Sequence, residues 1–197
     1  MILAQPEIRA AVAAGAIRFD PPLEETQWGG AAIDLRLGTQ FTKLQRVPGM
    51  KLSVHEGLGQ ISGFWKTKEL QLRDEFGKLN TFCIEPDEFI LAMTHESVTV
   101  PRDLIGLVEG RSTYARLGLS MHQTAPWIQP GWSGRIVLEI KNHGPARVEL
   151  TPLLDRPCQL VFFRLTSALP ETLGYGTRAG ETYANQRHPL QHDASPR

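Results

Sequence analysis

The 197-residue chain carries 21 lysines and arginines against 21 aspartates and glutamates, so its formal net charge at pH 7 is zero. Without a general positive field, binding to DNA, RNA or an anionic membrane surface is not expected, and an anionic ligand would need a local cluster of cations. Hydrophobic residues make up 41% of the chain, which indicates a packed core and excludes a disordered protein.

The N-terminal stretch MILAQPEIRAAVAAG places Glu7 and Arg9 among its apolar residues and lacks the pattern of a secretion signal. No apolar run reaches the length of a membrane-spanning helix. Two cysteines, Cys83 and Cys158, are too few for a disulfide scaffold and favour a cytoplasmic protein. Zinc-dependent nucleobase deaminases carry P-C-x-x-C, and Pro157-Cys158 lacks the second cysteine, so no zinc site is expected.

The first predicted element is a short helix over residues 6–14, because Pro6 suits a first helical turn and Gly15 suits the residue after the last. Apolar and polar residues then alternate over 33–37, which predicts a strand with one buried face. Residues 43–80 show no sustained period, and we interpret them as a variable insertion with one hairpin.

Strand signals dominate from residue 82 onward, so the predicted fold class is mainly β. One helical segment is expected over 111–117, ended by Gly118. The segment 169–197 has no period and by itself indicates a disordered tail. The predicted strands cover 82–84, 89–93, 97–100, 105–109, 119–123, 135–141, 147–150 and 159–165.

Gly110, Arg111 and Ser112, at the start of the predicted short helix, form a candidate anion cradle. Helix N–H groups there lack intrahelical partners, and Arg111 and Arg116 offer forked donors for phosphate oxygens. The alternative is an ordinary surface helix whose arginines extend into solvent. Spacing alone favours that alternative by roughly two to one.

Glu139 is a lone carboxylate in the middle of a β-rich strand, so it must reach water or face a polar pocket. One interpretation is a solvated strand face shared with Arg135 and Lys141. The functional interpretation is a general base in a half-enclosed cleft. The nearby PWIQPGW turn, residues 126–132, either presents a flat apolar surface to a planar ring or packs on the core, and His122 is expected to be structural.

Several motifs in a fixed order resemble the dCTP deaminase family, the deaminating branch of the trimeric dUTPase-like fold. The resemblance implies a single domain over 1–197, a distorted β-barrel or jelly roll, with a C-terminal lid at about 169–197. It also implies a homotrimer with nucleotide sites at the subunit interfaces. The motifs are AIDLRLG at 32–38, GRSTYARLGL at 110–119, TA at 124–125, PGWSG at 130–134, IVLE at 136–139 and YANQR at 183–187.

Members of this family hydrolyse the 4-amino group of dCTP to give dUTP and ammonia, without zinc and with Mg²⁺ carried by the triphosphate. By this resemblance Glu139 is the base that activates water, Ser112 and Arg116 hold that water and the carboxylate, and Arg111 binds phosphate. The implied substrate-binding residues are Ala125 at the base, Gln129 and Trp132 at the sugar, and Val137, Tyr175, Thr182 and Gln186.

Two of these positions depart from the family pattern. Gln129 replaces an aspartate expected at the sugar hydroxyl, and Thr182 replaces a basic residue expected at the phosphates. Two other functions stay open, and the departures favour the second of them. One is a deoxypyrimidine triphosphate diphosphatase or a bifunctional deaminase and diphosphatase, and the other is a non-catalytic nucleotide-binding regulator.

Overall fold

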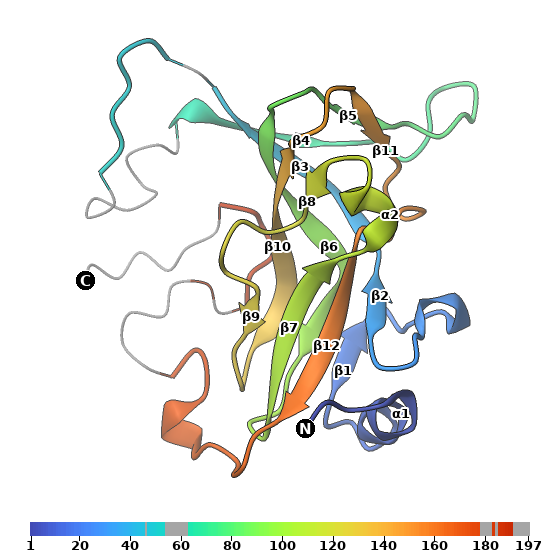
Figure 1. Ribbon diagram of the computed structural model, residues 1–197, viewed down its shortest axis with the longest axis vertical. Helices are drawn as coiled ribbons and strands as arrows, with labels where there is room; N and C mark the ends of the chain where they lie inside the picture. The colour runs from blue at the N-terminus through green and yellow to red at the C-terminus, as the bar shows by residue number, and fades with distance from the viewer. Residues whose placement is uncertain (46, 54–62, 178–182, 184, 191–197) are drawn as a thin grey trace.

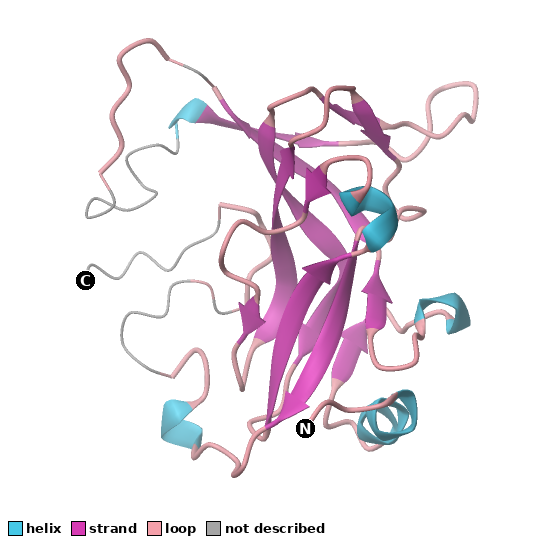
Figure 2. Cartoon of the chain, in the orientation of Figure 1, coloured by secondary structure: helices cyan, strands magenta, loops and turns pink. Residues whose placement is uncertain are grey.

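The computed structural model describes residues 1–45, 47–53, 63–177, 183 and 185–190, and most of its regular structure is β (Figures 1 and 2). None of the helices in these ranges has the length and apolar character needed to cross a membrane. The helical segments are α1 (Gln5–Ala13), η1 (Glu25–Gln27), α2 (Ser112–Ala115) and η4 (Glu171–Leu173). The strands are β1 (Arg18–Asp20), β2 (Ile33–Leu35), β3 (Leu37–Leu44), β4 (Trp65–Glu69), β5 (Phe82–Ile84), β6 (Phe89–Thr99), β7 (Leu104–Gly110), β8 (Leu119–Ser120), β9 (Trp127–Ile128), β10 (Ser133–Asn142), β11 (Val148–Leu150) and β12 (Cys158–Arg164).

The strands form separate antiparallel sheets rather than one closed barrel. The larger sheet has the order β4-β3-β6-β10-β8, with β1 added on β6. The second has the order β2-β12-β7-β9, and β11 pairs with β5. This mainly β arrangement confirms the predicted fold class in its jelly-roll form. Strands β3 and β4 pair antiparallel. The insertion predicted over 43–80 lies partly outside the described residues.

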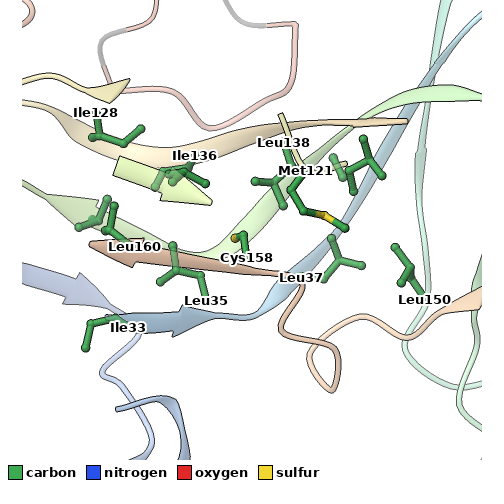
Figure 3. Packing of buried hydrophobic residues seen from close by; sticks show 14 of the residues in the cluster. Ile33, Leu35, Leu37, Met121, Ile128, Ile136, Leu138, Leu150, Cys158 and Leu160 are labelled. Carbon is green, nitrogen blue, oxygen red and sulfur yellow. The ribbon is translucent and has the colours of Figure 1, made fainter. Parts of the chain in front are cut away.

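Side chains from the two larger sheets meet in one core (Figure 3). Along β10, buried and half-buried residues alternate without exception, so Ile136 and Leu138 point inward while Val137 and Glu139 point to the other face. Leu160 and Cys158 of β12 reach the same core from the opposite sheet. The face that carries Glu139 is therefore fixed by the packing of its neighbours.

Several predicted boundaries differ from those of the structure. The residues predicted as two strands over 89–93 and 97–100 form the single strand β6, whereas the strand predicted over 33–37 is divided at Arg36. One contact explains both: the buried Glu96 carboxylate accepts the Arg36 backbone N–H at 2.9 Å and its Nε–H at 2.6 Å. Because these two N–H groups of Arg36 bind the buried Glu96 carboxylate, Glu96 can lie within strand β6.

The short elements around the site also differ from prediction. Helix α2 is shorter than the predicted 111–117, and it begins at Ser112 with Arg111 as its N-cap, without a side-chain cap. Strand β8 ends at Ser120, so most of the strand predicted over 119–123 is loop. On β12, buried and half-buried residues alternate, and Val161 and Phe163 are half-buried although the strand is apolar almost throughout.

We expect Glu96→Ala to lower the free energy of unfolding by about 3–5 kcal/mol, because it removes the buried acceptor of the Arg36 Nε–H, the Arg36 backbone N–H and the Gln27 side-chain amide. Glu24→Gln is the matched control, because Glu24 pairs with the same guanidinium at 2.6 Å but its side chain is 59% exposed. That change should cost less than about 1 kcal/mol. Urea denaturation of both variants checks this, and equal losses would contradict it.

Candidate active site

A cleft of about 430 Å³ opens beside β10. Its walls are formed by the half-buried face of β10, the loop from His122 to Gln129 and parts of β6 and β4. The C-terminal segment, meaning the described residues after β12, adds Tyr175, Tyr183, Gln186 and Pro189. In Figure 1 this C-terminal segment returns toward β10 after the chain has left β12. The cleft therefore gathers residues that are far apart in the sequence.

Glu139 lies in this cleft and is held by the loop opposite. Its Oε2 accepts the Gln123 backbone N–H at 3.1 Å, and its backbone N–H donates to the Met121 carbonyl at 3.1 Å. The Gln123 side-chain amide donates a hydrogen bond to the Glu139 backbone carbonyl at 3.0 Å. Among the described ion pairs none joins Glu139 to Arg135 or Lys141, so the carboxylate belongs to the cleft rather than to a charged strand face.

One end of the cleft is aromatic and polar. The rings of Trp132 and Tyr175 lie 5.1 Å apart at 50°. Trp132 is only 7% exposed and also packs on the core, while Gln129 and the buried Gln186 complete this end. A flat apolar surface beside amide groups suits a sugar and a base edge.

Glycines bring the C-terminal segment onto this end of the cleft. The Tyr175 N–H donates to the Pro130 carbonyl at 2.8 Å, and the Asn185 N–H donates to the Ser133 carbonyl at 3.0 Å. A Cβ on Gly134, whose φ is +146°, would lie 2.8 Å from the Gln186 backbone nitrogen. The segment can approach this closely only because no side chain intervenes.

The other end of the cleft is apolar. Leu91 is the cross-strand partner of Glu139, and Phe89 lies two residues along the same face of β6. Trp65 of β4 contacts Phe89 edge-on, with 6.4 Å between ring centroids. The strand pairing therefore places an apolar residue, Leu91, beside Glu139.

Helix α2 lies apart from the cleft of its own chain. Ser112 and Arg116 are exposed, and neither they nor Arg111 line the cleft. In Figure 1, α2 lies on the right side of the molecule between β11 and β2, whereas the described residues 185–190, drawn red, lie to the left beside β10. Three predicted site residues therefore lie outside the cleft that holds Glu139 in the same chain.

A sequence profile described as dCTP deaminase-like matches residues 2–165. The chain belongs to this dCTP deaminase-like family. The dUMP-forming dCTP deaminase of Halobacterium salinarum is 37% identical over 193 residues, with 96% of this chain and 92% of that protein covered. The dCTP deaminase of Alteromonas mediterranea is 37% identical over 179 residues, with 87% and 85% covered.

A solved structure supports the shared fold of the family. The crystal structure of 2′-deoxycytidine 5′-triphosphate deaminase from Agrobacterium tumefaciens superposes with a TM-score of 0.62 at 22% identity. The alignment covers 87% of this chain but only 50% of the other, so this chain spans half the length of that protein. At this identity the likeness concerns the fold alone.

The structure brings most of the residues implied by the family resemblance together, but not all. Thr182 lies outside the described residues, and Ser112, Arg116 and Arg111 lie apart on or before α2. The predicted residues that line the cleft are Glu139, Ala125, Gln129, Trp132, Val137, Tyr175 and Gln186.

Sequence reasoning missed part of the cleft. His122 lines it, with Nε2 at 3.4 Å from Glu109 Oε2, although the sequence favoured a structural histidine. Trp65 lies in the 43–80 region, which shows no sustained period, and the pairing of β4 through β3 to β6 leaves no signal in its local sequence. The alternation of Phe89 and Leu91 in β6 was the one available signal. Across the described residues, no three His, Cys, Asp or Glu side chains gather as a metal-ligand set.

Proposed function

We propose that this protein is a dCTP deaminase that releases ammonia and forms dUTP. The observation that carries the proposal is the position of Glu139 in the cleft, oriented by Gln123 and surrounded by residues that match the family's substrate-binding positions. Relatives of more than a third identity over most of the chain are named for this activity. The end of the cleft formed by Trp132 and Tyr175 would hold the deoxyribose, and the base would then lie next to the Glu139 carboxylate.

In the proposed reaction Glu139 acts as general base on a water molecule. The carboxylate takes a proton from water and passes it to N3 of the cytosine while the hydroxide oxygen bonds to C4. It then takes the proton of the new C4 hydroxyl and delivers it to the amino group. The C4–N bond breaks, ammonia leaves, and the C4 carbonyl of uracil forms. Glu139 ends in its starting charge state, and zinc has no part in this sequence.

Substrate positioning would come from the rest of the cleft. Trp132 and Tyr175 offer their faces to the sugar, and Gln129 offers a neutral amide to a sugar hydroxyl. The Ala125 loop and Val137 would border the base, and Gln186 would close over it. We propose that the C-terminal segment serves as a lid, which would exclude water other than the attacking molecule.

We further propose a homotrimer in which α2 of one subunit completes the cleft of its neighbour. The separation of Ser112, Arg116 and Arg111 from Glu139 within one chain supports this arrangement. Exposed Ser112 and Arg116 would then face the neighbour's carboxylate and water, and Arg111 would face the triphosphate. A shared site explains why these side chains project away from their own core.

Glu139→Gln should reduce deamination of dCTP by at least about a hundredfold, because an amide cannot accept the proton of water. Nucleotide binding and the unfolding temperature should change little, since the side chain keeps its size. Purified protein is incubated with dCTP and Mg²⁺, and ammonia and nucleotides are quantified by chromatography. Wild-type protein that binds dCTP without releasing ammonia would instead favour a non-catalytic regulator.

Mixed trimers test the shared site. Glu139→Gln and Arg116→Ala trimers should each be inactive, and refolding the two together should restore activity in a fraction of the sites. Activity should return because some subunit interfaces of a mixed trimer then join an intact Glu139 of one subunit to an intact Arg116 of its neighbour. Each variant refolded alone is the control. Absence of restoration, with mixed trimers demonstrated by mass spectrometry, would place both groups in one subunit's site.

Magnesium would enter this site with the substrate. The described residues offer no cluster of three ligands, and Mg²⁺ is commonly held by phosphates with few protein ligands, so we place its ligands on the triphosphate. When bound, the ion would neutralise phosphate charge. We expect EDTA to abolish turnover and excess Mg²⁺ to restore it, while the zinc chelator 1,10-phenanthroline has no effect. Inhibition by phenanthroline that Zn²⁺ reverses would contradict the zinc-independent proposal.

A second candidate is a bifunctional enzyme that also cleaves the triphosphate to give dUMP. Relatives named as dUMP-forming dCTP deaminases are 37% and 38% identical to this chain, as similar as those named simply dCTP deaminase. Overall similarity therefore does not decide the product. The chromatographic assay above does, because dUMP and pyrophosphate separate from dUTP.

A further inference from the structure

The Arg111 side chain is already held on two edges by partners in its own chain. Its Nη2 lies 3.2 Å from Oδ2 of Asp34 on β2, and its Nη1 donates to the Arg156 carbonyl at 3.0 Å. The Arg111 backbone N–H donates to the Pro157 carbonyl at 3.0 Å. The side chain nevertheless stays 35% exposed, so part of the guanidinium reaches the surface.

Asp34 is a partly buried carboxylate beside two arginines, Arg111 and Arg156. Burial raises the pKa of Asp34 above its ordinary value, and the opposing effects of Arg111 and Arg156 do not cancel it. A carboxyl whose pKa is raised in the folded state favours ionisation less there than in the unfolded chain. Ionised Asp34 therefore costs folding stability at neutral pH. Side chains that work against stability often serve a functional site.

We infer that Asp34 is a positioning residue, which fixes the Arg111 guanidinium so that its remaining N–H donors face the nucleotide triphosphate. The inference rests on the proposed function, in which Arg111 binds phosphate. A guanidinium has more N–H donors than Asp34 and the Arg156 carbonyl occupy, and its planar fork matches phosphate oxygens. Because the side chain is ordered before the ligand arrives, less conformational entropy is lost on binding.

A neighbouring contact supplies the matched control. The Tyr114 hydroxyl donates to Asp155 Oδ1 at 2.7 Å and accepts the Arg156 backbone N–H at 3.1 Å. Burial, together with the hydrogen bond to Asp155, raises the pKa of Tyr114 to about 12, so this hydroxyl is a neutral donor at ordinary pH. It binds α2 to the same loop that carries the Arg156 carbonyl, and its two hydrogen bonds go to Asp155 and Arg156 rather than to the Arg111 guanidinium.

The test is a double-mutant cycle of Asp34→Asn and Arg111→Ala, with every protein carrying Glu139→Gln to prevent turnover. Isothermal titration calorimetry with Mg²⁺ gives the Kd values for dCTP and for dCMP. Asp34→Asn should weaken dCTP binding roughly two- to tenfold and leave dCMP binding unchanged, because only the triphosphate reaches Arg111. In the Arg111→Ala protein the same change should have no effect. The unfolding temperature should stay constant or rise.

The control variant is Tyr114→Phe, which should lower the unfolding temperature without changing the ratio of the two Kd values. Three results would overturn the inference: equal effects of Asp34→Asn with and without Arg111, equal effects on dCTP and dCMP, or tighter dCTP binding. Tighter binding would show that Asp34 competes with phosphate for the guanidinium. A parent protein that binds neither nucleotide would overturn the proposed function and this inference with it.

Discussion

The alternation of side chains along β10 is the constraint on which the candidate site depends. Ile136, Leu138 and Ile140 are buried in the core between the sheets, so the intervening Val137 and Glu139 must face the cleft. A shift of one residue would place three apolar side chains in the cleft and a carboxylate in the core. The hydrophobic effect that folds the strand therefore also fixes the orientation of the proposed general base.

The remainder of the cleft is assembled by close backbone contacts rather than by strand pairing alone. The turn from Pro130 to Gly134 accepts the C-terminal segment through main-chain hydrogen bonds, and its glycines leave the space for this approach. Among its described residues, Glu171–Leu173 form the helical turn η4, and Tyr175 and Asn185 are bound to the turn by main-chain hydrogen bonds. Such contacts with a distant part of the chain leave no periodic pattern in the local sequence.

The residues at helix α2 differ from the C-terminal segment. The family resemblance implies that Ser112, Arg116 and Arg111 are functional, but within one chain they do not line the cleft. Arg111 is anchored by Asp34 and by the loop before β12, so its direction is fixed by the fold of its own subunit. Neither Arg111 nor the residues of α2 line the cleft that holds Glu139 in the same subunit. A site shared between neighbouring copies would reconcile the fixed geometry with the family resemblance.

The sequence by itself determined the mainly β fold class, the strand that carries Glu139, the helical turn after Arg111 and the motifs of the dCTP deaminase-like family. These depend on local periodicity and on contiguous residues. Only the tertiary structure decided that β6 is one strand, since Glu96 depends on Arg36 from a distant segment. It also decided that Trp65 and His122 line the cleft and that α2 does not. Such features arise from contacts between residues far apart in the chain, which no local pattern encodes.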